Sequence, residues 1–147
     1  MNGATNSGPL SSIVLVVAGM TLVFTGLYFI LLRPPLLPED VRYMGLLPPE
    51  IDLIGPRLAG WLTQVFRVMG GYVFATGVLT IAIAATSFRE RRLAAAVGTL
   101  IAGAASIGLM AAVNFMIDSN FKWVLLGMAL VWALSLGLLL FERNPSA

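Results

Sequence analysis

The sequence predicts an all-α integral membrane protein, a bundle of four transmembrane helices with a structured loop between the first two. Hydrophobic residues make up 59% of the 147 residues and charged residues 11%, against roughly 45–50% and 25% in a typical soluble domain. The mean hydropathy is +0.92. Four apolar runs each have about the 20 residues that a helix needs to cross a bilayer of roughly 30 Å. We expect one transmembrane domain over residues 1–147.

The four predicted spans account for most of the chain. They cover residues 11–32, 61–86, 93–117 and 123–141. The first carries no charge and ends before Arg33-Pro34-Pro35, because proline cannot continue a helix. Each span must be helical, since lipid offers backbone amides no hydrogen-bond partner and the pattern lacks the alternation of a barrel strand.

The loop at residues 33–60 is too long for a minimal connection and too apolar for a disordered linker. Pro38-Glu39-Asp40 and Pro49-Glu50 are each typical of the first turn of a short helix, where proline is tolerated and acids are favoured. We expect two short segments at the non-cytoplasmic interface that cap the bundle. Contact with a partner or ligand is the alternative, because ordered long loops are often functional.

The turn between the second and third spans holds the densest positive charge. Cytoplasmic loops are enriched in Lys and Arg, so this turn predicts that it and both termini lie in the cytoplasm. Its arginines would contact lipid headgroups, and a docking site for a soluble partner is the alternative. The arginines concerned are Arg89, Arg91 and Arg92.

Arg67 is a permanent charge near the start of the second span. In hydrocarbon it must find a partner, at a cost of roughly 2.5 kcal/mol or more. The third span ends on the same side of the membrane, so antiparallel neighbours predict a shared polar cluster. Glu50 or Asp52 of the loop could pair with Arg67 in place of Asp118. The alternative to a carboxylate partner is snorkelling, in which Arg67 reaches water and lipid phosphate. The predicted membrane cluster is Gln64, Arg67, Asn114 and Asp118.

Small residues recur at helical spacing in the last three spans, a pattern that marks close helix packing in lipid. Packing within the bundle is the first interpretation, and a face left for another subunit is the second. Trp132 lies in mid-span, where we expect it to face a partner or a bound lipid, with filling of the bundle as the alternative. The small residues are Gly71, Ala94, Gly98, Ala102, Ser106, Gly108, Ala133 and Gly137.

The chain has no cysteine and no histidine, so its own side chains lack the commonest thiolate and imidazole ligands of metals and haem. We therefore expect no cofactor held by its side chains, and we expect bound lipid. A net charge of +2 is too small to predict nucleic-acid binding.

Two stretches carry a resemblance to known families. LLPEDVRYMG and GPRLAGWLTQVFRVMGGYVFATGVLTIAIA resemble an uncharacterised group of bacterial multispan membrane proteins with an LPxD-type loop before an arginine and a Gly-Gly pair. The part from Phe66 onward also resembles small four-helix, DoxX-like membrane proteins. The resemblance implies a fold and a bacterial cytoplasmic (inner) membrane, and it implies no reaction. The matching positions are Leu37, Pro38, Asp40, Gly45, Arg57, Arg67, Gly70 and Gly71.

No hydrolase elbow, P-loop, dinucleotide fingerprint, zinc spacing or redox pair is present, so we do not expect an enzyme. We expect an accessory or assembly subunit that contacts membrane lipids and either a larger membrane complex or copies of itself. The alternative is a carrier or channel for a small solute or anion, working as a homo-oligomer through the Arg67 cluster. An enzyme acting on lipid would have these acids or bases: Asp40, Glu50, Asp52 and Asp118.

Overall fold

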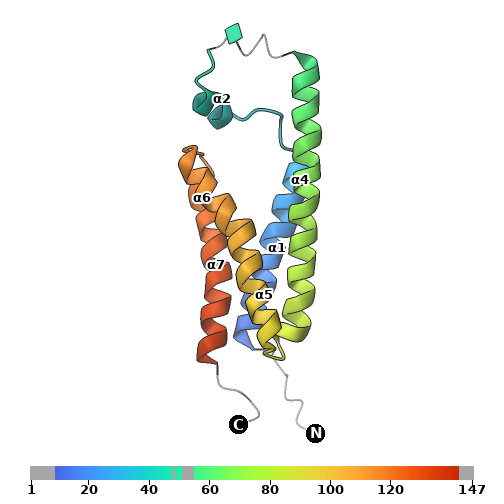
Figure 1. Ribbon diagram of the computed structural model, residues 1–147, viewed down its shortest axis with the longest axis vertical. Helices are drawn as coiled ribbons and strands as arrows, with labels where there is room; N and C mark the ends of the chain where they lie inside the picture. The colour runs from blue at the N-terminus through green and yellow to red at the C-terminus, as the bar shows by residue number, and fades with distance from the viewer. Residues whose placement is uncertain (1–8, 48, 51–54, 143–147) are drawn as a thin grey trace.

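The computed structural model describes residues 9–47, 49–50 and 55–142, and the regular elements in this part are all helical. Four helical stretches are long and apolar enough to cross a membrane, which confirms the four predicted helices, while their crossing of a membrane stays a prediction (Figure 1). The elements are α1 (Leu10–Leu31), α2 (Pro38–Met44), α4 (Pro56–Ile83) with a π-helical turn (Ala84–Phe88), α5 (Leu93–Gly103) with a π-helical turn (Ala104–Gly108), α6 (Leu109–Met116) and α7 (Lys122–Phe141).

The second spanning helix begins earlier than predicted, at Pro56 and not at Trp61. Gly55 precedes it, and proline suits the first helical position because its missing N–H would have no partner there. The π-helical turn then prolongs α4 to Phe88. The connecting loop is therefore shorter than predicted and ends at Gly55.

Glycines bring α1 and α4 into backbone contact. A Cβ atom on Gly77 would lie 2.7 Å from the carbonyl oxygen of Gly19, and one on Gly26 would lie 2.5 Å from the backbone nitrogen of Phe74. A Cβ on Gly70 would lie 2.8 Å from the carbonyl oxygen of Gly26. Helices associate in lipid through such close approach and the van der Waals contact that it permits. The two helices thus form the most tightly joined pair in the bundle.

The remaining helices are arranged around this pair. α1 also packs against α7, which in turn contacts α5 and α6 (Figure 1). The glycine contacts place Gly19 opposite Gly77 and Gly26 opposite Gly70, so the end of α1 at Leu31 lies level with about Val65. The first turns of α4 consequently project beyond α1, at the same end of the bundle as α2 (Figure 1).

The predicted small-residue stripe mostly faces outward, contrary to the first interpretation. Ala102 packs against the core and Ser106 is half-buried. The physical reason is that α5 and α6 pack chiefly along one side, against α7. The neighbours of Gly108 are atoms of its own helix. The remaining members either are exposed or have open space where a Cβ would stand: Gly71, Ala94, Gly98, Ala133 and Gly137.

Trp132 fills the bundle, so the expectation that it faces a partner is wrong. Its side chain is only 3% exposed. The indole Nε1–H donates a hydrogen bond to the carbonyl oxygen of Thr99 at 3.0 Å. The ring occupies the space over Gly103, where a Cβ atom would lie 2.1 Å from Nε1. A glycine opposite the ring and a carbonyl acceptor together accommodate a large polar-tipped side chain in the interior.

The loop contains the first of the two predicted short helices, α2. Pro38 is its first residue, and the Asp40 carboxylate accepts a hydrogen bond from the Leu37 N–H at 2.9 Å. Gly45 ends the helix with a positive φ of 67°, which glycine adopts without steric cost. For the second segment, residues 49 and 50 are helical, and residues 51–54, including Asp52, lie outside the described residues.

Candidate functional site

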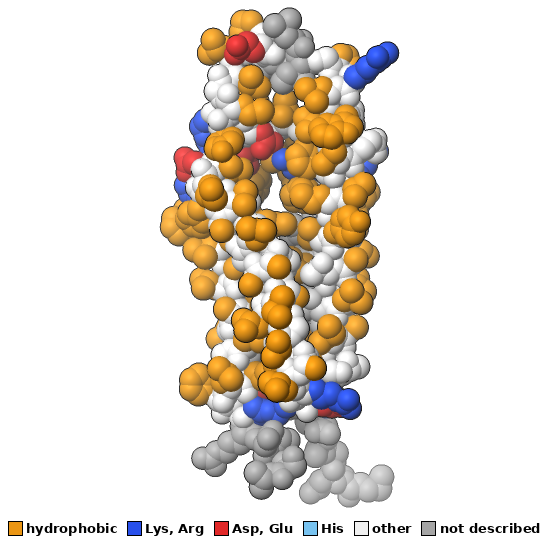
Figure 2. Space-filling model, in the orientation of Figure 1, with side chains coloured by type: hydrophobic (Ala, Val, Ile, Leu, Met, Phe, Trp, Pro, Cys, Tyr) orange, Lys and Arg blue, Asp and Glu red, His pale blue; other side chains and the backbone are white. Residues whose placement is uncertain are grey.

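A cavity of about 690 Å³ lies beneath α2, among α1, α4, α6 and α7. Figure 2 shows it as a hollow on the face between α4 and α6, with acidic and basic side chains at its α2 end. Its apolar walls include Phe29, Phe66, Met69, Met110, Val113 and Met128. Its polar side chains include Arg33, Glu39, Asp40, Asn114 and Ser119. The cavity is thus apolar along its length and charged at one end.

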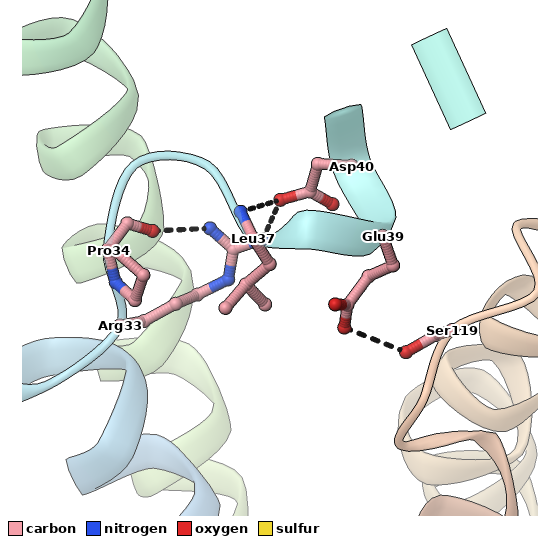
Figure 3. A network of polar contacts seen from close by, with 6 residues as sticks. All are labelled: Arg33, Pro34, Leu37, Glu39, Asp40 and Ser119. Carbon is pink, nitrogen blue, oxygen red and sulfur yellow. Dashed lines mark hydrogen bonds and ion pairs between the residues drawn. The ribbon is translucent and has the colours of Figure 1, made fainter. Parts of the chain in front are cut away.

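Arg33 is a buried cation at this end. It lies just after Leu32, the residue that caps α1, and its side chain is 6% exposed. Nη2 donates to the Asp40 carboxylate at 3.0 Å, and Nη1 donates to the Pro34 carbonyl at 3.0 Å (Figure 3). The guanidinium carbon also lies 3.3 Å from the ring centroid of Phe66, within the range of a cation–π interaction. The Phe29 ring centroid lies 5.4 Å from the same carbon. Arg33 is therefore balanced by one carboxylate and lies against two aromatic rings.

Asp40 connects α1 with α2. The oxygen that accepts from Arg33 also accepts the Leu37 N–H that begins α2. This reach back from the third helical residue satisfies a backbone donor that the helix itself leaves unpaired. The position of α2 over the cavity therefore depends on a charge at the end of α1.

Glu39 is a buried carboxylate whose charge has no partner. It is 2% exposed, and its Oε1 accepts a hydrogen bond from the Ser119 hydroxyl at 3.1 Å. No ion pair in the described part of the chain includes Glu39. Its second oxygen points away from Ser119 into the space below α2 (Figure 3). Burying a carboxylate is costly unless a cation or several donors compensate it.

A second, smaller cavity of about 210 Å³ continues the first toward the middle of the bundle. Both cavities are lined by Met69 of α4 and Met110 of α6. The smaller one is also lined by Thr76 and Ser106, further along the same helices. Methionine is unbranched and flexible, so the two side chains that the cavities share lie where a change of rotamer would alter the separation between them.

The predicted polar cluster is not assembled, because the cavity separates α4 from α6. Arg67 is exposed and makes no hydrogen bond or ion pair with any residue that the structure describes, and Gln64 is exposed too. Asp118 pairs with Lys122, the residue one helical turn later. The Asn114 amide donates to the Met110 carbonyl at 2.8 Å and reaches the cavity wall. Of the four predicted residues, only Asn114 belongs to the site.

The predicted rival carboxylate Glu50 accepts the Leu47 N–H at 2.7 Å instead of pairing with Arg67. The helix register places Arg67 about level with Phe29, close to the end of α1. An exposed arginine at that depth fits the alternative of snorkelling, in which the aliphatic stem crosses apolar surface and the charge reaches the headgroups.

The arginine turn lies at the opposite end of the bundle from α2. Nη2 of Arg91 donates to the Leu139 carbonyl and so ties the turn to the end of α7. Arg92 forms an exposed ion pair with Glu90 at 2.7 Å, and Arg89 is exposed. At the same end, Glu142 accepts hydrogen bonds from the backbone N–H and the hydroxyl of Ser11. These contacts close the end of the bundle away from the cavity.

We expect the pKa of Asp118 to be measurably lower in the folded protein than the ordinary value of an aspartate. The hydrogen bond and the charge of Lys122 hold the pKa of this carboxyl below its ordinary value of 3.8. A lowered pKa in the folded state means that the pair stabilises the fold above the ordinary pKa and loses this effect as the pH falls through the folded pKa. Carboxyl NMR titration of the protein in micelles should show the low pKa, and Lys122→Met should raise it toward 3.8. An unchanged pKa in Lys122→Met would contradict this assignment.

The sequence interpretation missed Arg33 and Glu39. It counted Arg33 among the loop charges and Glu39 among the acids of a short helix. Phe29 and Arg33 stand four residues apart, a spacing that puts an aromatic ring and a cation on one helix face. That spacing is the signal that could have identified Arg33.

Among the residues that the structure describes, no three or more His, Cys, Asp or Glu side chains are grouped so as to hold a metal ion. Comparison of the chain with models of protein families, with curated proteins and with solved structures found no significant match. The geometry of the cavity is therefore the ground on which a function can be argued.

Proposed function

We propose that this chain is a small membrane protein that binds a membrane amphiphile in the cavity beneath α2. The observation that carries the proposal is an apolar cavity that ends at three charged side chains, Arg33, Glu39 and Asp40. A lipid has the matching form, with a polar head and a long apolar chain. The volume of about 690 Å³ is within the roughly 300–1,000 Å³ of typical ligand pockets.

The surroundings of the cavity support entry of the amphiphile from the bilayer. The hollow lies on a face between two of the four helices proposed to cross the membrane (Figure 2). The groove past Met69 and Met110 runs along those helices, in the direction that an acyl chain takes in a bilayer. A lipid could thus place its chain in the groove and its head beneath α2 without leaving the membrane.

A bulky residue in the groove should remove the bound lipid. We expect Met110→Trp to lower the lipid retained per chain by about tenfold, because an added ring competes with the ligand at a cost of roughly 1–3 kcal/mol. Native mass spectrometry of the protein released from nanodiscs measures the retained lipid. Leu130→Trp is the matched control, since Leu130 is 60% exposed on α7 and does not line the cavity. Equal retention in both variants would contradict the proposal.

The accessory or assembly subunit predicted from the sequence is our second candidate. The observation that favours it is the open space over the exposed glycines Gly98 and Gly127, since exposed glycines let another helix approach closely in lipid. The same mass spectra would reveal foreign polypeptides in stoichiometric amount, and their absence would count against this candidate. An anion carrier based on Arg67 has no such support, because its cluster is not assembled.

Location in the bacterial inner membrane remains a prediction from the resemblance, and the cytoplasmic position of both termini remains a prediction from the arginine turn. Under that orientation the cavity and α2 lie on the non-cytoplasmic side. The bound lipid would then come from the outward-facing leaflet of the membrane.

A further inference from the structure

The charges at the α2 end of the cavity do not balance. Arg33 is paired with Asp40 at 3.0 Å, and Arg42 of α2 donates to the Asp118 carbonyl, so no cation in the described part of the chain is paired with Glu39. Glu39 is 2% exposed and receives one hydrogen bond, from the neutral hydroxyl of Ser119. A buried carboxylate requires a positive charge or more donors than this. Arg33, Asp40 and Glu39 are the charged side chains that line the cavity. Together they carry one more negative charge than positive charge.

We infer that the amphiphile carries a primary ammonium group and that Glu39 recognises it. This inference rests on the proposed function and identifies the head group for the same site. An ammonium group brings both the missing charge and N–H donors, and hydrogen bonds between ionised groups are the strong ones. The ligand class is therefore an aminophospholipid or another lipid with a primary amine.

The hydrogen bonds around Ser119 leave one carboxylate oxygen ready for the ligand. The Ser119 oxygen accepts the backbone N–H of Phe121 at 3.1 Å, and its own O–H donates to Oε1 of Glu39. This arrangement fixes the orientation of the carboxylate. Oε2 receives no hydrogen bond from the described residues, and it points into the space below α2 (Figure 3). The ammonium N–H groups would donate to Oε2.

Arg33 provides a place for the phosphate of an aminophospholipid. A guanidinium has five N–H donors, and Arg33 uses two of them, toward Asp40 and Pro34. Because Arg33 also lines the cavity, its remaining donors can bind phosphate oxygens, for which arginine is well suited. Phosphate near Arg33 and ammonium near Glu39 match the two ends of a zwitterionic head.

The test is a competition among lipids that differ only in their head groups. The full chain in micelles is offered equal amounts of phosphatidylethanolamine, phosphatidylcholine and phosphatidylglycerol with identical acyl chains, and native mass spectrometry identifies the lipid retained. We expect phosphatidylethanolamine to be preferred over phosphatidylglycerol by about tenfold, as for one charge-assisted hydrogen bond. Glu39→Gln should abolish this preference among the lipids that it retains.

The control is Glu90→Gln, which changes an exposed acid at the other end of the bundle and should keep the preference. Equal retention of the three lipids by the wild type would overturn the inference and leave the proposed function standing. Equal retention of phosphatidylcholine and phosphatidylethanolamine would overturn donation by N–H groups, because the quaternary head has none. Retention of no lipid would overturn both proposals.

A preference that survives in Glu39→Gln would show that Glu39 is not the recognising residue. If Glu39→Gln does not fold, as judged by circular dichroism, Glu39→Asp is measured in its place. The shorter side chain withdraws the charge from the cavity and should reduce the preference for phosphatidylethanolamine. An unchanged preference in a folded Glu39→Asp would likewise overturn the role of Glu39.

Discussion

Gly77→Leu is expected to separate α1 from α4 and to lower the free energy of unfolding by about 3 kcal/mol or more. A Cβ at this position would lie 2.7 Å from the carbonyl oxygen of Gly19 and 2.7 Å from the backbone nitrogen of Val23. Overpacking usually costs roughly 1–3 kcal/mol when side chains can adjust. Here the obstacle is backbone of a neighbouring helix, which cannot change rotamer, so the helices must move apart.

Moving apart is costly because the contact is cooperative along both helices. Gly19 and Gly26 on α1 face Gly77 and Gly70 on α4, so a clash at one end also opens the other. In a bilayer, lost helix contact is not compensated by a hydrophobic gain, since lipid tails are as apolar as the side chains. The effect of Gly77→Leu should therefore exceed that of a substitution elsewhere on the same helix.

Gly71→Leu is the matched control for this prediction. Gly71 lies on the same helix, and a Cβ there would meet nothing within 4 Å. Glycine costs about 1 kcal/mol relative to good helix formers, so this variant should be neutral or more stable. Both free energies are measured by denaturant titration in micelles, followed by circular dichroism. A similar loss of stability in both variants would contradict the close contact between α1 and α4.

The long apolar helices could be predicted from the sequence, but the contacts between them could not. Apolar runs of bilayer length predicted four helices that are long and apolar enough to cross a membrane, because length and composition alone set that signal. The packing face of α4 was placed on Gly71, one residue from the true contact at Gly70. Each residue turns the helix by about 100°, so adjacent glycines point to different neighbours. Choosing between them requires the arrangement of the helices.

The helix α4 begins at Pro56, before the predicted span that starts at Trp61, because apolarity alone set the bounds of that span. The sequence Gly55-Pro56 is itself typical of a helix start, but the predicted span followed the apolar run, which begins at about Trp61. A helix that projects past its neighbours leaves the apolar region, so its first turns need not be hydrophobic. Hydropathy locates the part of a helix inside the membrane and not the end of the helix.

The charged end of the cavity could be predicted only in part. Acids in the first turn of α2 were expected on local grounds, and Asp40 does reach back to the Leu37 N–H. The Glu39 side chain points into the bundle because it accepts a hydrogen bond from Ser119, eighty residues further along the chain. No pattern in the local sequence could predict a contact over that separation. Arg67 was predicted to be the functional arginine because it interrupts an apolar run, but its side chain is exposed. The arginine with a buried side chain at the cavity is Arg33, which lies in the loop after α1.

Arg33→Leu is expected to release α2 from the bundle and to lower stability by about 2 kcal/mol. Removing one partner of a buried ion pair costs roughly 3–5 kcal/mol, and the effect should be smaller here because Asp40 is 21% exposed. The variant also loses the cation–π contact with Phe66. Asp40 and Glu39 would then be adjacent acids with no cation paired to either of them, and their repulsion favours an undocked helix.

Hydrogen exchange measured by mass spectrometry should show this release as lost protection of the amides at residues 40–46, while the spanning helices stay protected. Arg92→Leu is the control, because its ion pair with Glu90 is exposed, with side chains 68% and 58% accessible, and such pairs contribute little. The double variant Arg33→Leu/Asp40→Asn keeps a hydrogen-bond acceptor for the Leu37 N–H but removes the uncompensated charge. It should therefore recover part of the protection, and if it does not, the charge of Asp40 is not what Arg33 balances.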